Sequence, residues 1–84
     1  MACYVYILGA LDGTPRHTYV GWTVDLGARV EAHNSGKGAK FTRGRRWALL
    51  YAEKYRTRTE AMRREWHLKR DRRFRGGLYG PETP

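Results

Sequence analysis

Two segments rich in aromatic and β-branched residues near the start of the chain constrain the fold most strongly. Residues 3–8 read CYVYIL and residues 17–23 read HTYVGWT. β-Branched and aromatic residues dominate both segments, which is typical of β-strands. Asp12-Gly13 and Pro15 lie between them and favour a turn over a helix. The two segments therefore predict a pair of antiparallel strands.

Side chains alternate along the first predicted strand. One face carries Tyr4, Tyr6 and Leu8, and the other face carries Cys3, Val5 and Ile7. In the second predicted strand, Gly21 interrupts the pattern. A glycine there indicates either a bulge or a position where another group approaches the backbone closely.

The rest of the chain alternates between helix and strand patterns. Asp25 is a predicted N-cap for a helix over residues 26–34, which Gly36 ends. A glycine-rich loop covers residues 36–46, and residues 47–55 (WALLYAEKY) predict a third strand. Thr57 and Glu60 form a capping box for a second helix from residue 58 to about residue 74.

This order predicts an α+β domain in which helices pack on a short sheet. We expect the domain to cover residues 1–75, followed by a flexible tail of residues 76–84 that contains two prolines. The 84 residues leave no room for a second domain.

The charge balance points to a polyanionic partner. Seventeen Lys and Arg residues against eight Asp and Glu residues give a formal net charge of +9. A small, strongly basic domain most often binds nucleic acid, although ribosome association and a membrane surface are alternatives. No apolar run approaches the ~20 residues that span a bilayer, and the start lacks a signal-peptide pattern, so we expect a cytoplasmic protein. One cysteine excludes a disulfide framework and a Cys-rich zinc site.

Glu65 is out of place on the second predicted helix. A helical wheel puts it in a mainly apolar arc that also holds Ala61, Met62, Trp66, Leu68 and Lys69. A buried carboxylate without a partner is costly, so Glu65 needs a basic residue, a hydrogen-bond network or a metal ion. The residues alone leave open an ion pair, for example with Arg29, and a metal site.

Several short motifs follow one another in a specific order. Tyr4-Val5-Tyr6 lies on the first predicted strand and Tyr19-Val20-Gly21 on the second, and Arg29, His33-Asn34 and Glu65 follow. In this order and spacing the chain resembles the GIY-YIG nuclease superfamily over residues 3 to about 70. It is especially similar to the small single-domain bacterial members and to the structure-selective resolvase nucleases that cut branched DNA. The resemblance implies a three-stranded antiparallel sheet flanked by helices and a metal-dependent phosphodiesterase.

The resemblance also implies roles for individual residues. Tyr19 matches the tyrosine that is the best candidate for the general base, and Tyr6 would position the attacking water. Arg29 would hold the phosphate, and His33 would support a tyrosine or shuttle a proton. Glu65 would bind one Mg²⁺ ion, which Mn²⁺ is expected to replace. Whether Tyr19 or His33 is the base stays open.

The chain departs from the family pattern at two positions. Tyr4 stands where the first motif usually begins with glycine, and Trp22 stands where some branches carry a lysine beside the nucleophile. The chain also carries no zinc-binding or DNA-targeting domain of the kind that many relatives use to choose substrates. The form of the substrate is therefore the least determined property.

The loop of residues 36–46 is a candidate nucleic-acid contact. It lacks the GxxxxGK[ST] pattern, so no nucleotide cofactor is expected. Its basic side chains suit a phosphate track, and an aromatic ring among them can stack on a base. The predicted contact residues are Lys37, Lys40, Phe41, Arg43, Arg45 and Arg46. Residues 69–75 contain a second basic cluster. The sequence favours neither of its two interpretations, a nucleic-acid contact and a solvent-exposed helix end.

These observations predict a divalent-metal-dependent nuclease that hydrolyses phosphodiester bonds in DNA, with a role in DNA repair. Branched and single-stranded DNA are the candidate forms of the substrate. The alternative is a module of the same fold that binds DNA or RNA and has little or no catalytic activity. The sequence does not determine whether the protein is an endonuclease or an exonuclease, and it does not determine the oligomeric state.

Overall fold

The sheet has three antiparallel strands in the order β2-β1-β3: β1 covers Cys3–Ala10, β2 Thr18–Thr23 and β3 Trp47–Tyr55. The computed structural model describes residues 2–11 and 17–78. The predicted turn residues 12, 13 and 15 lie outside the described residues. At the centre of the sheet, Tyr6 in β1 is opposite Gly21 in β2 and Ala52 in β3. The predicted α+β fold with a three-stranded antiparallel sheet is confirmed.

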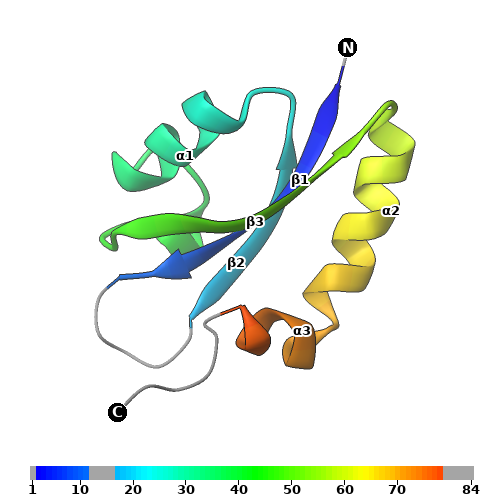
Figure 1. Ribbon diagram of the computed structural model, residues 1–84. Helices are drawn as coiled ribbons and strands as arrows, with labels where there is room; N and C mark the ends of the chain where they lie inside the picture. The colour runs from blue at the N-terminus through cyan, green and yellow to red at the C-terminus, as the bar shows by residue number, and fades with distance from the viewer. Residues whose placement is uncertain (1, 12–16, 79–84) are drawn as a thin grey trace.

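The central strand β1 is buried on both faces because helices cover both. The helix α1 (Leu26–Asn34) and the helix α2 (Arg58–Lys69) lie on opposite sides of the sheet in Figure 1. On the α2 side, the core consists of Cys3, Val5, Ile7, Val20, Ala61 and Leu68. On the α1 side, it consists of Tyr6, Leu8, Ala10 and Trp47, against which Leu26 and Val30 pack. The alternation along β1 thus separates an aliphatic core from the face that carries Tyr6.

Local hydrogen bonds fix where the helices begin. The Asp25 side chain accepts a hydrogen bond from the Ala28 backbone amide at 3.1 Å, which caps α1. Thr57 and Glu60 form the predicted capping box at the start of α2. A short 3-10 helix, η1 (Lys40–Thr42), lies in the glycine-rich loop between α1 and β3. No helix in the described part of the chain is long and apolar enough to cross a membrane.

The second predicted helix is wrong in its length. It ends at Lys69 instead of continuing to about residue 74, and a third helix, α3 (Arg72–Gly77), follows. The Asp71 side chain accepts a hydrogen bond from the Phe74 amide at 2.9 Å, so Asp71 caps a new helix instead of extending the old one. The tail predicted from residue 76 begins inside α3, and Leu78 packs against the core. Residues 79–84 lie outside the described residues.

The predicted core-facing arc of α2 is only half buried. Ala61 and Leu68, at one edge of the arc, are fully buried, whereas Met62 is 46% exposed and Trp66 is 53% exposed. The predicted arc is therefore too wide, because only its Ala61–Leu68 edge packs in the core with β1. Glu65 still faces the protein, since its side chain is only 20% exposed.

Candidate active site

The hydroxyl of Tyr6 is the point where the predicted site residues meet. Tyr6 lies in β1 and is 1% exposed, and its hydroxyl oxygen is 2.8 Å from Nε2 of His33 in α1. The charges and hydrogen-bonding groups that act on this hydroxyl are Arg29, Tyr19 and Glu65. The rings of Tyr6 and Tyr19 are 6.4 Å apart, and those of Tyr19 and His33 are 4.9 Å apart. All five residues therefore gather in one place, although they come from four different elements.

A hydrogen-bond chain fixes the position of the proton on His33. The Thr42 hydroxyl donates to the Ala39 carbonyl oxygen at 2.8 Å, so its single proton is committed. The same hydroxyl oxygen lies 2.8 Å from Nδ1 of His33 and must therefore accept a proton from Nδ1. A neutral His33 then has its lone pair on Nε2 and accepts the hydrogen bond from Tyr6. The orientation of the Tyr6 proton thus follows from a threonine on η1.

Burial determines the charge state of this pair. Burial lowers the pKa of His33 below its usual value, and the positive charge of Arg29 lowers it further. Burial also raises the pKa of the Tyr6 hydroxyl, although hydrogen bonding with Arg29 opposes the shift. At neutral pH the pair consists of a protonated tyrosine and a neutral imidazole, which is ready to accept a proton.

The absence of a side chain at Gly21 and at Gly38 makes room for the side chains of Tyr6 and His33. A Cβ atom on Gly21 would lie 2.5 Å from the Tyr6 hydroxyl oxygen, which is far too close. A Cβ atom on Gly38 would lie 2.3 Å from Nδ1 of His33. The interruption predicted at Gly21 is therefore the close approach of the Tyr6 side chain. Any larger residue at either position would displace the Tyr6–His33 pair.

Glu65 is the acidic member of the site. Its carboxylate is 3.6 Å from the Lys69 ammonium, one turn further along α2. Lys69 is 53% exposed in its side chain, so this ion pair is weak. Among the described residues, no group of three or more His, Cys, Asp or Glu side chains comes together. A single carboxylate would suit a hard cation such as Mg²⁺, which keeps several of its own water ligands in proteins.

A second network holds α2 in place against β3. The Arg64 guanidinium donates to both carboxylate oxygens of Glu53, at 2.9 and 3.1 Å. The Tyr51 and Tyr55 hydroxyls donate to the same carboxylate. Burial disfavours the charged form of Glu53, but these hydrogen bonds outweigh it and lower the pKa of Glu53. Because Arg64 directly precedes Glu65, this network also holds the part of α2 that carries Glu65.

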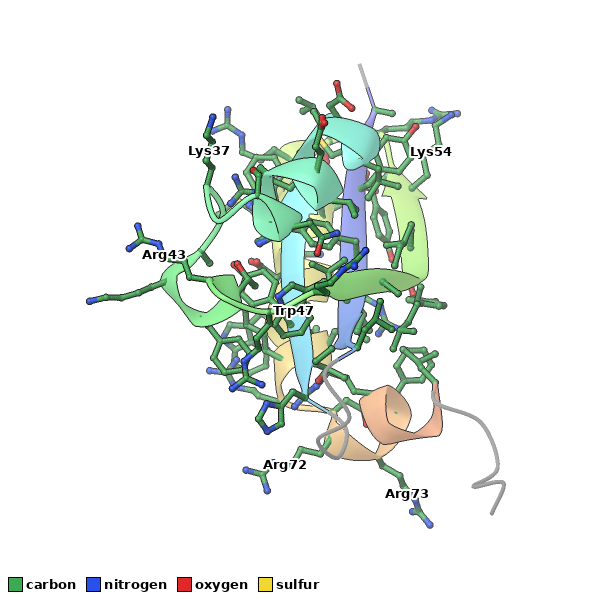
Figure 2. All side chains as sticks on the ribbon, turned by 90° about the vertical axis from the view of Figure 1, so that its left-hand side faces the viewer. Lys37, Arg43, Trp47, Lys54, Arg72 and Arg73 are labelled. Carbon is green, nitrogen blue, oxygen red and sulfur yellow. The ribbon has the colours of Figure 1, made fainter. Side chains whose placement is uncertain are left out.

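The predicted nucleic-acid contacts divide into anchored and outward-facing residues. Phe41 is 51% exposed, and the Arg45 guanidinium lies over its ring at 5.6 Å and contacts His17. Figure 2 shows Lys37 and Arg43 pointing outward on the side of the molecule where Arg72 also lies. Lys54 lies on the other side, in the strand β3. Lys40 and Arg46 are exposed. Lys37 and Arg43 of the basic loop thus lie on the same side of the molecule as Arg72 of α3.

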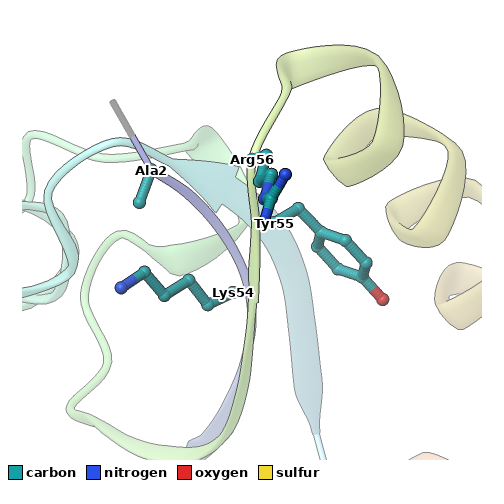
Figure 3. Close-up of a pocket in the computed structure, with 4 residues that line it drawn as sticks. All are labelled: Ala2, Lys54, Tyr55 and Arg56. Carbon is teal, nitrogen blue, oxygen red and sulfur yellow. The ribbon is translucent and has the colours of Figure 1, made fainter.

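A separate hollow is lined by none of the candidate site residues and none of the predicted nucleic-acid contacts. Figure 3 shows it at the start of β1 and the end of β3, where it is lined by Ala2, Lys54, Tyr55 and Arg56. Lys54 and Tyr55 point to opposite sides of the strand, so they do not converge on one point. The chemistry of the candidate site therefore lies elsewhere, around Tyr6.

Comparison with known proteins identifies the family of this chain. A family model described as the GIY-YIG catalytic domain matches residues 2–77. The chain belongs to the GIY-YIG family. It is 46% identical over 67 residues to the UPF0213 proteins of Staphylococcus aureus strains Mu3 and Mu50, which covers 79% of this chain and 78% of each relative. The resemblance inferred from the sequence motifs is confirmed.

A solved GIY-YIG relative has the same fold. The solution NMR structure of the UPF0213 protein BH0048 from Bacillus halodurans is 41% identical to this chain, with a TM-score of 0.53. The similarity covers 96% of this chain and 89% of that chain. The fold is therefore of the nuclease type, and a nuclease-type domain of this family suggests nucleic-acid binding.

Sequence reasoning missed three parts of this GIY-YIG site. Thr42 and Gly38 lie in the loop of residues 36–46, which is interpreted from the sequence only as a phosphate-binding loop. The available signal was the hydroxyl of Thr42, because phosphate binding by the basic side chains gave it no role. Glu53 is a lone acid between Tyr51 and Tyr55 on one face of a strand, and this alternation was the available signal.

Proposed function

We propose that this chain is a divalent-metal-dependent nuclease that hydrolyses phosphodiester bonds in DNA. The observation that carries the proposal is the convergence of Arg29, His33 and Glu65 on the Tyr6 hydroxyl. These groups supply the three things that the reaction needs: a proton acceptor, a cation for the phosphate and a ligand for a metal ion.

The proton acceptor is the Tyr6–His33 pair. As a water molecule attacks the phosphorus atom, it gives a proton to the Tyr6 oxygen, and the Tyr6 proton moves along the 2.8 Å hydrogen bond to Nε2 of His33. A neutral imidazole is a better base near pH 7 than a tyrosine whose pKa is raised. Tyr19, the base implied by the family resemblance, is the alternative acceptor, since its ring lies 4.9 Å from that of His33.

Arg29 and Glu65 act on the charges of the reaction. The Arg29 guanidinium binds the phosphate oxygens, and negative charge accumulates on these oxygens as the new bond forms. Glu65 would hold a Mg²⁺ ion, for which we expect Mn²⁺ to substitute. The ion supplies Lewis-acid stabilisation of the phosphate and of the departing oxygen.

One observation favours a second function, a DNA- or RNA-binding module without catalysis. The Lys69 ammonium lies 3.6 Å from the Glu65 carboxylate and competes with a metal ion for it. A permanent Glu65–Lys69 pair would leave the basic side of the molecule able to bind nucleic acid but unable to cut it.

A cleavage assay separates the two functions. Labelled single-stranded, duplex, flap and four-way-junction DNA are incubated with the protein in Mg²⁺, in Mn²⁺ or in chelator, with matched RNA strands in parallel. We expect cleavage in either metal and none in chelator, and we expect Glu65→Gln to bind but not cut. Binding without cleavage under all metal conditions would favour the binding module.

A further inference from the structure

A groove lies along the free edge of β2, next to the candidate active site. One wall comes from β2 and η1, and the other comes from the end of α2 and from α3. The residues that line it are Thr18, Tyr19, Val20, Phe41, Lys69 and Arg75. An adjoining hollow shares Thr18 and Arg75 and extends the groove to Arg72.

The first wall of the groove is aromatic and held rigidly. The Phe41 ring lies nearly parallel to the Tyr19 ring, at an interplanar angle of 19° and a centroid distance of 6.3 Å. The ring of buried Trp47 also packs beside Phe41, at a centroid distance of 5.9 Å. Phe41 nevertheless stays 51% exposed, with the Arg45 guanidinium 5.6 Å from its ring centroid. A flat ring that is held by its neighbours and half exposed is a platform for another planar group.

The second wall is cationic, and part of it is fixed. The Arg75 guanidinium donates to the Thr18 hydroxyl at 2.9 Å and to the Leu68 carbonyl oxygen at 2.5 Å. Lys69 is 53% exposed in its side chain and lies 3.6 Å from Glu65. The groove therefore has an aromatic side and a cationic side, and through Lys69 it ends at the carboxylate of the candidate site.

We propose that this groove binds one unpaired nucleotide next to the phosphate that is cut. Its base stacks on Phe41, and its phosphates contact Lys69 and Arg75. A paired base within a duplex is already stacked on its neighbours and cannot offer its face to Phe41. This inference rests on the proposed nuclease function and adds the substrate class: strands with unpaired nucleotides, as in single-stranded or branched DNA.

The test compares two exposed aromatic residues. Phe41 and Trp66 are exposed to nearly the same degree, 51% and 53%, and each lies beside an arginine, but only Phe41 lines the groove. Affinities of the full chain for labelled single-stranded and duplex DNA are measured by fluorescence anisotropy in chelator, so that cleavage does not interfere. Circular dichroism checks that each variant is folded.

We expect the unchanged protein to bind the single strand more tightly than the duplex. Phe41→Ala should weaken single-strand binding about tenfold or more and duplex binding by less than about twofold. Phe41→Trp should retain the preference, because it keeps a flat ring and does not open a cavity. Trp66→Ala should change neither affinity.

Two results would overturn the inference and leave the nuclease proposal intact. One is equal loss of single-strand and duplex affinity in Phe41→Ala; the other is loss of single-strand affinity in Trp66→Ala but not in Phe41→Ala. Failure of the unchanged protein to bind any of the oligonucleotides would overturn the proposed function as well. The two failures are therefore distinguishable.

Discussion

Replacing Thr42 by valine removes the hydroxyl that orients His33 while keeping the shape of the side chain. Thr42 is fully buried, and its hydroxyl makes two hydrogen bonds of 2.8 Å. Without it, the Nδ1 proton of His33 and the Ala39 carbonyl oxygen lose their partners. Each unpaired buried group costs about 1–3 kcal/mol, so we expect a loss of about 2–6 kcal/mol in the free energy of unfolding. Since about 1 kcal/mol shifts the Tm of a domain of this size by about 4–8 °C, the Tm should fall by at least roughly 8 °C.

The substitution should also affect catalysis in the folded protein. Once Nδ1 has no acceptor, His33 can move its proton to Nε2 and then donates to Tyr6 instead of accepting from it. Only the remaining fraction of molecules has a base in the correct form. Since a positioned base contributes about 10²–10⁴-fold to a rate, we expect the single-turnover cleavage rate to fall at least about tenfold.

Thr42→Ser is the matched control. It keeps the hydroxyl and both hydrogen bonds and loses one methyl group, which costs about 1 kcal/mol. Cleavage is measured with excess enzyme at a temperature where circular dichroism shows both variants folded. If Thr42→Val then cleaves as fast as Thr42→Ser, the orientation of His33 does not matter, and the proton-transfer argument is wrong.

Three other perturbations test the site independently. Glu65→Gln should abolish Mg²⁺-dependent cleavage with little change in Tm and with retained DNA binding; normal cleavage by this folded variant would exclude Glu65 from the reaction. His33→Gln should slow cleavage more than Tyr19→Phe, and the reverse order would make Tyr19 the base. Because burial lowers the pKa of His33, the unfolded chain binds a proton at His33 at a higher pH than the folded chain does. Chemical denaturation at a series of pH values should therefore show stability falling as the pH drops below about 6.5 and constant above it, and the slope should be smaller in His33→Gln.

The elements that depend on local signals could be predicted from the sequence. The helix over Leu26–Asn34 and the strand over Trp47–Tyr55 have the expected bounds, because a capping aspartate and a run of β-formers define them within a few residues. The alternation of Tyr6 and Leu8 against Val5 and Ile7 also predicted the two faces of β1. These features depend only on the spacing of neighbouring residues.

The second helix shows where local reasoning fails. Its sequence contains few apolar residues, so the predicted arc extended from Ala61 and Leu68 to Met62 and Trp66. The contact with the sheet decides which part of this arc is buried, because only Ala61 and Leu68 pack in the core with Val5 and Ile7. Asp71 is equally ambiguous: it is compatible with a helix interior and with an N-cap, and the structure uses it as the cap.

The order and spacing of the short motifs in the sequence determined the family, and through the family they nominated Tyr6, Arg29, His33 and Glu65. Only the tertiary structure decided how these groups are connected. The Tyr6–His33 and His33–Thr42 contacts join residues 27 and 9 positions apart, so no local pattern encodes them. The direction of the proton on His33 depends on a buried hydroxyl on η1 and on the space left by Gly38. Such properties arise from burial, which removes water as a competing partner and limits each polar group to the few protein groups within hydrogen-bond distance.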